Sequence, residues 1–103
     1  MYREGAPPPP LLKVAAGGFL GGTFVSGWLM VTTTSVAFAA VQGLGWDIPI
    51  AWIGRVMPCS VASASTNGVR FEDMRGPTYE LLVAEPAVIV DQMRTILFES
   101  PYR

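Results

Sequence analysis

The sequence predicts a mainly α membrane protein, in which one long transmembrane helix is followed by a short interfacial amphipathic helix and a small extramembrane C-terminal region ending in an amphipathic helix. The main observation is a run of 33 residues between Lys13 and Asp47 without any Asp, Glu, Lys or Arg, although the chain holds seven basic and eight acidic residues. Half of the 103 residues are hydrophobic and 15% are charged, below the roughly 25% that is usual in globular domains. Prolines precede this run and glycines interrupt its end.

Residues 1–10 are expected to form an extended Pro-rich tail, because the four prolines Pro7–Pro10 cannot lie inside a helix. Pro10 suits the first position of a helix, so the transmembrane helix is expected over residues 11–45. As a helix, most of this segment would be roughly 48 Å long, more than the ~30 Å of hydrocarbon that a span must cross. Gly43 then breaks the helix.

Small residues recur at helical spacing near the start of the predicted span. Gly17 and Gly21 are four residues apart, and so are Gly18 and Gly22, whose row continues to Ser26. Residues four apart stack on one face of a helix, and glycines there let a neighbouring helix approach closely within a membrane. These five residues are therefore the predicted helix-packing interface.

The segment 46–58 is expected to lie at the membrane interface. Trp46 and Trp52 are the predicted anchors, because tryptophan is enriched at the level of the lipid headgroups. Residues 50–57 place Trp52 and Val56 on one side, as in an amphipathic helix that is too short to span the bilayer.

Residues 59–103 form the predicted extramembrane region. The pair Asn67-Gly68 favours the tight turn of a small hairpin, residues 79–83 favour a strand or a short helix, and a further helix is expected over residues 85–99. One helix and one hairpin bury little apolar surface alone, so we expect this region to dock onto other subunits.

Two other interpretations of the uncharged run stay open. Lys13, the apolar run and the small-x-small pattern at 37–39 match a signal peptide, which would release an exported domain beginning near Ala40. Alternatively, the β-branched residues at 31–36 favour strands, and the run would then be the core of a soluble assembly protein at a subunit interface.

Composition excludes several kinds of chemistry. The net charge of −1 and the lack of clustered Lys and Arg argue against a nucleic-acid partner. The chain has no histidine, which removes imidazole catalysis and His-bearing metal or haem sites, and its single cysteine, Cys59, cannot form an internal disulfide. No nucleophile or phosphate-loop motif accompanies the acidic residues. We therefore expect no catalytic residue, no cofactor or metal site and no small-molecule substrate.

The predicted function is that of a non-catalytic accessory subunit of a multi-subunit membrane complex, of respiratory, ATP-synthase or photosynthetic type, which stabilises assembly through its Gly-lined helix and clamping tails. Its partners would be other membrane-protein subunits and the lipid bilayer. The expected location is an energy-transducing inner membrane, mitochondrial or bacterial, with a single span and the N-terminus on the matrix or cytoplasmic side. The alternative functions are a structural protein of an assembly such as a virion, and a small exported domain.

Overall fold

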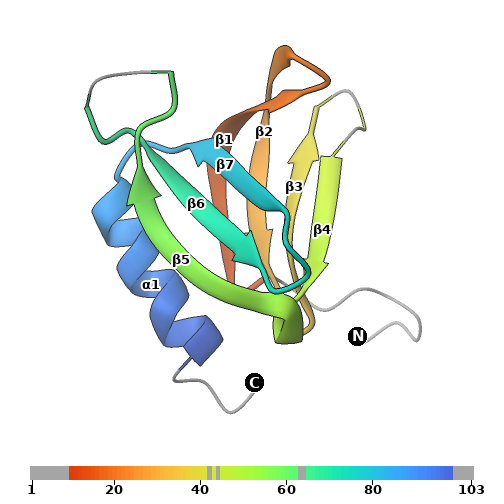
Figure 1. Cartoon of the computed structure of the whole chain (residues 1–103), viewed down its shortest axis with the longest axis vertical. Helices are drawn as coiled ribbons and strands as arrows, with labels where there is room; N and C mark the ends of the chain where they lie inside the picture. The colour runs from red at the N-terminus through yellow and green to blue at the C-terminus, as the bar shows by residue number, and fades with distance from the viewer. Residues whose placement is uncertain (1–9, 42, 44, 63–64, 99–103) are drawn as a thin grey trace, which may run out of the picture.

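The computed structural model describes residues 10–41, 43, 45–62 and 65–98, which form an antiparallel β domain with a helix at its C-terminal end (Figure 1). These residues build seven strands, one short 3₁₀ helix and one α-helix. Their bounds are β1 Leu12–Leu20, β2 Thr23–Val31, β3 Ser35–Ala40, β4 Gly45–Pro49, η1 Ile50–Trp52, β5 Ile53–Cys59, β6 Gly68–Asp73, β7 Thr78–Leu82 and α1 Pro86–Phe98.

All seven strands belong to one sheet, in the order β4-β3-β2-β1-β7-β6-β5, with antiparallel neighbours throughout. The sheet folds over into two layers, with β1–β4 behind and β5–β7 in front in Figure 1. β1 and β7 join the layers through one register pair, Gly17↔Leu82. Helix α1 packs on β5 and β6, on the left in that view. One edge of the sheet, β5, therefore lies beside the helix, and the other edge is β4.

The first hairpin shows why this apolar sequence forms strands rather than a helix. Along β2, Leu29 and Val31 are buried while Trp28 is exposed, which follows the two-residue period of a strand. Gly21 and Gly22 connect β1 to β2 with φ values of +60° and +83°. A two-residue hairpin turn of type I′ requires a positive φ at both of its central residues, and glycine adopts it without steric cost.

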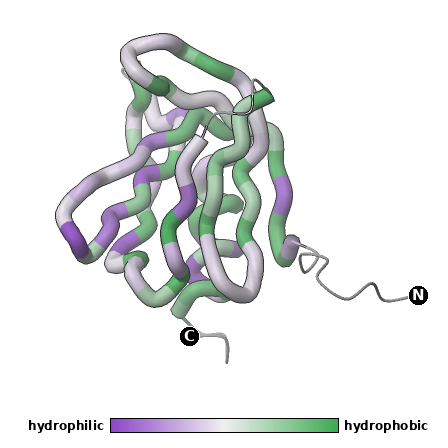
Figure 2. Tube along the Cα trace, turned by 90° about the vertical axis from the view of Figure 1, so that its right-hand side faces the viewer, coloured by the Kyte–Doolittle hydropathy of each residue, from purple (hydrophilic) through white to green (hydrophobic). Residues whose placement is uncertain are grey.

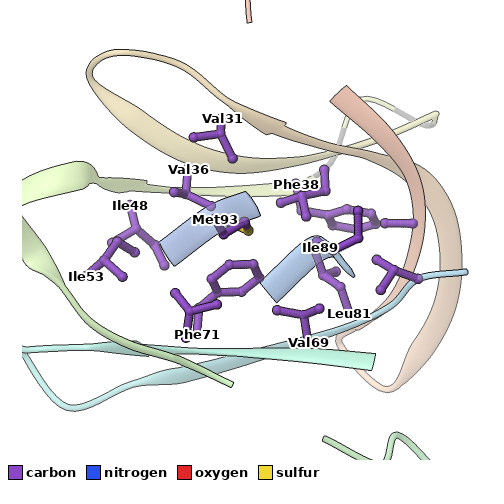
Figure 3. Close-up of a cluster of buried hydrophobic side chains, with 14 of the residues drawn as sticks. Val31, Val36, Phe38, Ile48, Ile53, Val69, Phe71, Leu81, Ile89 and Met93 are labelled. Atoms are coloured by element: carbon purple, nitrogen blue, oxygen red, sulfur yellow. The ribbon is translucent and has the colours of Figure 1, made fainter. Parts of the chain in front are cut away.

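The core fills the space between the two layers, and α1 closes one side of it (Figure 3). Phe38 from β3, Phe71 from β6 and Met93 from α1 are each at most 1% exposed. The other side chains buried to this degree are Leu29, Val31, Val36, Ile48, Ile53, Val69, Leu81 and Leu97. Both halves of the sequence therefore build one core. The C-terminal region therefore buries its apolar surface together with the N-terminal strands, and its docking onto other subunits stays a prediction.

The predicted transmembrane helix over residues 11–45 is wrong. These residues form β1, β2, β3 and the start of β4, and among the described residues we find no helix with the length and apolar character that crossing a membrane requires. The inner face of these strands lies in the core, and their outer face carries small uncharged residues such as Ala15, Ser26 and Ala39. Between Lys13 and Asp47 neither face holds a charged residue, so the run lacks the polar alternation by which a half-buried strand is normally recognised.

The short interfacial helix predicted at residues 50–57, within the segment 46–58, is also wrong, because the segment forms β4, η1 and β5. Ile53 and Val56 are both buried although they are three positions apart, a spacing that suits a helix. The strand achieves it through a register shift between Ile53 and Arg55, where its pairing with β6 is irregular. Such a bulge changes which face of the sheet the following residues occupy. In the sequence, the resulting spacing of apolar residues is the same as in a helical turn.

The remaining sequence expectations concern the C-terminal region and the tail. Helix α1 lies inside the expected range 85–99, and the segment expected to be a strand or a short helix is β7. Gly68 begins β6 instead of turning a small hairpin, and β6 pairs with β5 and β7. Residues 63 and 64 of that expected hairpin and residues 1–9 of the Pro-rich tail lie outside the described residues.

Candidate binding cleft

A cleft opens between β1 and β7, the two strands that connect the layers. Beyond the pair Gly17↔Leu82 no further register pair joins them within the described residues. Residues 18–20 of β1 and residues 78–80 of β7 instead line opposite sides of a cleft of about 530 Å³. The other lining residues are Gly21, Trp46, Val61 and Arg70. The cleft thus lies where two neighbouring strands of the sheet diverge, and Figure 1 shows β7 crossing in front of β1.

Aromatic rings form the inner part of the cleft. Trp46 of β4 and Tyr79 of β7 lie with ring centroids 4.7 Å apart, and Trp46 also contacts Phe71 at 5.8 Å and Phe38 at 6.2 Å. Trp46 and Tyr79 are half-buried, whereas the two phenylalanines behind them belong to the core. Rings held in this way present apolar surface that is already ordered, which lowers the entropic cost of binding a ligand.

Charged groups lie along the outer side of the cleft. Nε of Arg70 is 3.8 Å from a carboxylate oxygen of Glu72 and 4.0 Å from one of Glu80, distances too long for hydrogen bonds. This Nε is buried and has no hydrogen-bond partner among the described residues. A buried N–H without an acceptor costs free energy, so an acceptor that enters the cleft would gain a hydrogen bond at this position.

Cys59 lies near this charged group, on the neighbouring strand β5. Partial burial and the carboxylate of Glu80 both raise the pKa of its thiol above the ordinary value, in that order of importance. The thiol is therefore protonated near neutral pH. Because the thiolate is the nucleophilic form, Cys59 is a poor candidate for covalent chemistry.

The cleft offers strand backbone, aromatic rings and one buried guanidinium N–H. The part of the chain that the structure describes holds no group of three or more Cys, Asp or Glu placed to bind a metal ion. A site of this composition is suited to recognising an uncharged or mixed polar and apolar ligand by shape and hydrogen bonds.

The predicted helix-packing residues do not share one helical groove, because that helix is absent. Gly17 and Ser26 face each other as a pair across the β1–β2 hairpin, and Gly18 lies in β1. Gly21 and Gly22 form the turn between the two strands. Gly18 and Gly21 line the cleft. That these five residues contact another protein stays a prediction.

The two predicted membrane anchors have different environments in the domain. Trp46 packs between the layers, as described above. Trp52 lies in η1 with 44% of its surface exposed, and the guanidinium of Arg75 sits 5.1 Å from its ring centroid. The sequence reasoning missed Arg70 and Tyr79 as cleft residues. The alternation of buried Val69 and Phe71 around Arg70 is the one local signal that could have placed Arg70 on the outer face of a strand.

The fold and the cleft define a small antiparallel β domain of seven strands packed against a C-terminal helix. No protein-family model matches the sequence, and no curated protein matches it significantly. The structure is similar to the crystal structure of the C-terminal domain of an unknown protein from Leishmania infantum, with a TM-score of 0.68 and 15% sequence identity over 89% of this chain and 83% of that one. At this identity the similarity establishes the fold alone.

These findings overturn the predicted accessory subunit of a membrane complex and its inner-membrane location, because both rested on a span that the structure replaces with strands. The two alternative functions gain no support either. Phe38, in the middle of the signal-peptide pattern, is 1% exposed in the core, so cleavage beside it would remove strands that the domain needs. The strands of the uncharged run cover this chain's own core, whereas the assembly-protein alternative placed that core at a subunit interface.

Proposed function

We propose that this chain is a non-catalytic protein-binding domain that holds an extended peptide segment of another protein in the cleft between β1 and β7. The observation that carries this proposal is the single register pair between these neighbouring strands, followed by a cleft of about 530 Å³ lined by both of them. An extended peptide placed there would lie between two strands of the sheet.

The backbone of both walls is suited to such a peptide. β1 pairs with β2 as far as Leu20↔Thr23, and β7 pairs with β6 from Thr78 onward, so each wall has a strand neighbour on its other side. On the sides that face the cleft, β1 and β7 have no strand partner beyond the pair Gly17↔Leu82 within the described residues. Strand addition uses main-chain N–H and C=O groups in this situation, and it is a common way for domains to bind peptides.

The side chains of the cleft narrow the chemistry of the peptide. Trp46 and Tyr79 favour an apolar or aromatic side chain directed inward. Nε of Arg70 favours an acceptor oxygen, and the carboxylates of Glu72 and Glu80 beside it disfavour an anion there. A peptide carbonyl, which is a neutral acceptor, satisfies both conditions.

The test is a selection of random dodecapeptides displayed on phage, followed by titration of each synthetic peptide into the isotope-labelled chain. We expect backbone amide shifts to change at residues 18–20 and 78–80, and we expect the replacement Tyr79→Ala to weaken binding. N-methylation of alternate peptide residues keeps the side chains but removes main-chain donors. Two series are made, one methylated at the odd and one at the even positions, and one of them should bind at least about tenfold more weakly than the parent peptide.

Two arginine variants distinguish the effect of a cleft residue on peptide binding from the effect of removing a positive charge anywhere on this face. Arg70→Met should weaken peptide binding. Arg55→Met should leave it unchanged, because the side chain of Arg55 is 68% exposed and does not line the cleft, although its Nη1 also lies 3.8 Å from a carboxylate oxygen of Glu72. The proposal is wrong if the selected peptides change shifts elsewhere on the domain, or if both N-methylated series bind as well as the parent peptides.

A further inference from the structure

The outer face of the β1–β4 layer carries the uncharged run, and its composition differs from that of an ordinary solvent face. Exposed or half-buried residues here include Ala15, Trp28 and Ala39, with Trp28 at 43% exposure. Figure 2 shows the hydropathy of each residue along the chain, seen from the side on which β3 and β4 lie in Figure 1. Helix α1 packs on the other layer, and no described element covers this face.

Two rows of residues run across the four strands of this face. The register joins Lys13 of β1 to Met30 of β2, Met30 to Ala37 of β3, and Ala37 to Asp47 of β4. One step along, the same pairings produce the row Ala15, Trp28, Ala39, Gly45. In both rows the large residue stands on β2 and a small residue stands on β3. The first row also ends in opposite charges, roughly 14 Å apart at the usual strand spacing.

We infer that this face binds a second copy of the same chain, through a two-fold axis that runs parallel to the strands between β2 and β3. That axis places β2 of one copy over β3 of the other and β1 over β4. Trp28 then faces Ala39 of the second copy, and Met30 faces Ala37. Lys13 faces Asp47 of the second copy, and symmetry repeats each of these contacts. An interface in which each copy uses the same surface is the commonest arrangement in homodimers.

Size and charge are therefore complementary in the same orientation. A bulky side chain opposite an alanine lets two sheet faces approach to about 10 Å without a void, as in β-sandwich packing. The ammonium of Lys13 already lies 4.9 Å from the ring centroid of Trp28 in one copy, so the charge is held at the edge of the apolar surface.

The area of the face sets the strength of the dimer. Four strands at about 4.8 Å spacing and six residues at about 3.4 Å rise cover roughly 400 Å² per copy, about half of the ~800 Å² per partner in a standard stable interface. The dimer is accordingly weak and reversible, with the chain monomeric when dilute and paired when concentrated. This inference uses a different surface from the peptide cleft and does not depend on it.

The test is sedimentation velocity and concentration-dependent NMR on the full chain, from about 10 µM to about 1 mM. We expect reversible dimerisation, with amide shifts that move with concentration in β2 and β3. Lys13→Asp alone and Asp47→Lys alone should each weaken association by about tenfold, because each places like charges opposite one another at two symmetric contacts. The combined variant Lys13→Asp, Asp47→Lys should restore it to within about twofold of the original.

A matched control makes the same charge change elsewhere. Asp91→Lys alters an exposed acid on α1 and should leave association unchanged. Ala39→Leu, which fills the position that receives Trp28, should weaken dimerisation while circular dichroism confirms the fold. A chain that stays monomeric throughout the concentration range would overturn the inference. So would a charge-swapped double variant that associates no better than either single one.

Discussion

Arg94 of α1 donates hydrogen bonds from Nη2 and Nε to the carbonyl oxygen of Val56, at 3.1 Å and 3.3 Å. Val56 belongs to β5, an edge strand, so this carbonyl faces away from the neighbouring strand β6 and toward the helix. The guanidinium thus occupies an acceptor that an edge strand would otherwise present to solvent or to another chain. One residue both attaches the helix and protects one edge of the sheet.

Removing this side chain should loosen the helix. Arg94→Met keeps the apolar stem but deletes the donors, and we expect the free energy of unfolding to fall by about 1–2 kcal/mol, as for a hydrogen bond from a charged donor. Urea denaturation followed by tryptophan fluorescence measures the loss. Arg55→Met, which removes an exposed ion pair, should cost less than about 0.5 kcal/mol. Equal losses in both variants would contradict the assigned role.

The turn between β6 and β7 should make stability depend on acid. The carboxylate of Asp73, 1% exposed, accepts hydrogen bonds from the backbone N–H of Arg75 at 2.8 Å and from its Nε at 2.9 Å. The side-chain hydrogen bond from Arg75, more than any other interaction, lowers the pKa of Asp73 below its ordinary value of 3.8.

Because the pKa is lower in the folded state, the unfolded chain binds the proton more readily. The stabilisation is complete above the ordinary value, and it is lost as the pH falls through the lower pKa of the folded protein. Urea denaturation between pH 2 and pH 7 should therefore show a decline in acid that is smaller in Asp73→Asn. Asp91→Asn, on exposed helix surface, should keep the decline of the original chain. An unchanged pH profile in Asp73→Asn would argue against this turn as its source.

The helix contributes to the core through residues that are completely buried. Met93 is 0% exposed and lies between the two layers in Figure 3. Met93→Ala should lower the free energy of unfolding by about 2–5 kcal/mol, through lost burial and the cavity that remains. Val88→Ala, on the same helix but 49% exposed, should change it by less than about 0.5 kcal/mol. Chemical denaturation distinguishes the two. Similar losses would mean that α1 does not pack as described.

Sequence reasoning located some elements and misjudged others for identifiable reasons. The C-terminal helix was recognisable because Ile89, Met93 and Leu97 recur at helical spacing and are all buried on one face. The first three strands were not, since between Lys13 and Asp47 their outer face carries alanine, glycine and tryptophan instead of charged residues. An uncharged strand pair and an apolar helix have the same composition, and only the two-residue alternation of burial distinguishes them.

The cleft was less predictable than the fold. It depends on where β1 and β7 diverge, and these strands are about 60 residues apart in the sequence, so no local pattern links Gly18 to Tyr79. Trp46 was singled out from the sequence as a membrane anchor, whereas in the structure its ring packs against that of Tyr79 in the cleft. Arg70 becomes noteworthy only when Glu72 and Glu80 are seen on either side of it at distances beyond hydrogen bonding.

Replacing a turn glycine by alanine should change the free energy of unfolding in opposite directions in a strand hairpin and in a helix. Gly21 and Gly22 have positive φ, and an added Cβ at either position would meet no atom within 4 Å, so a substitution there is opposed by the backbone alone. Gly22→Ala should therefore lower the free energy of unfolding by about 1–2 kcal/mol, whereas Gly22→Asn, which tolerates this conformation, should cost less. In a helix, Gly→Ala would instead raise stability by about 1 kcal/mol. Urea denaturation of the three proteins measures the sign directly, and stabilisation by Gly22→Ala would contradict the hairpin turn.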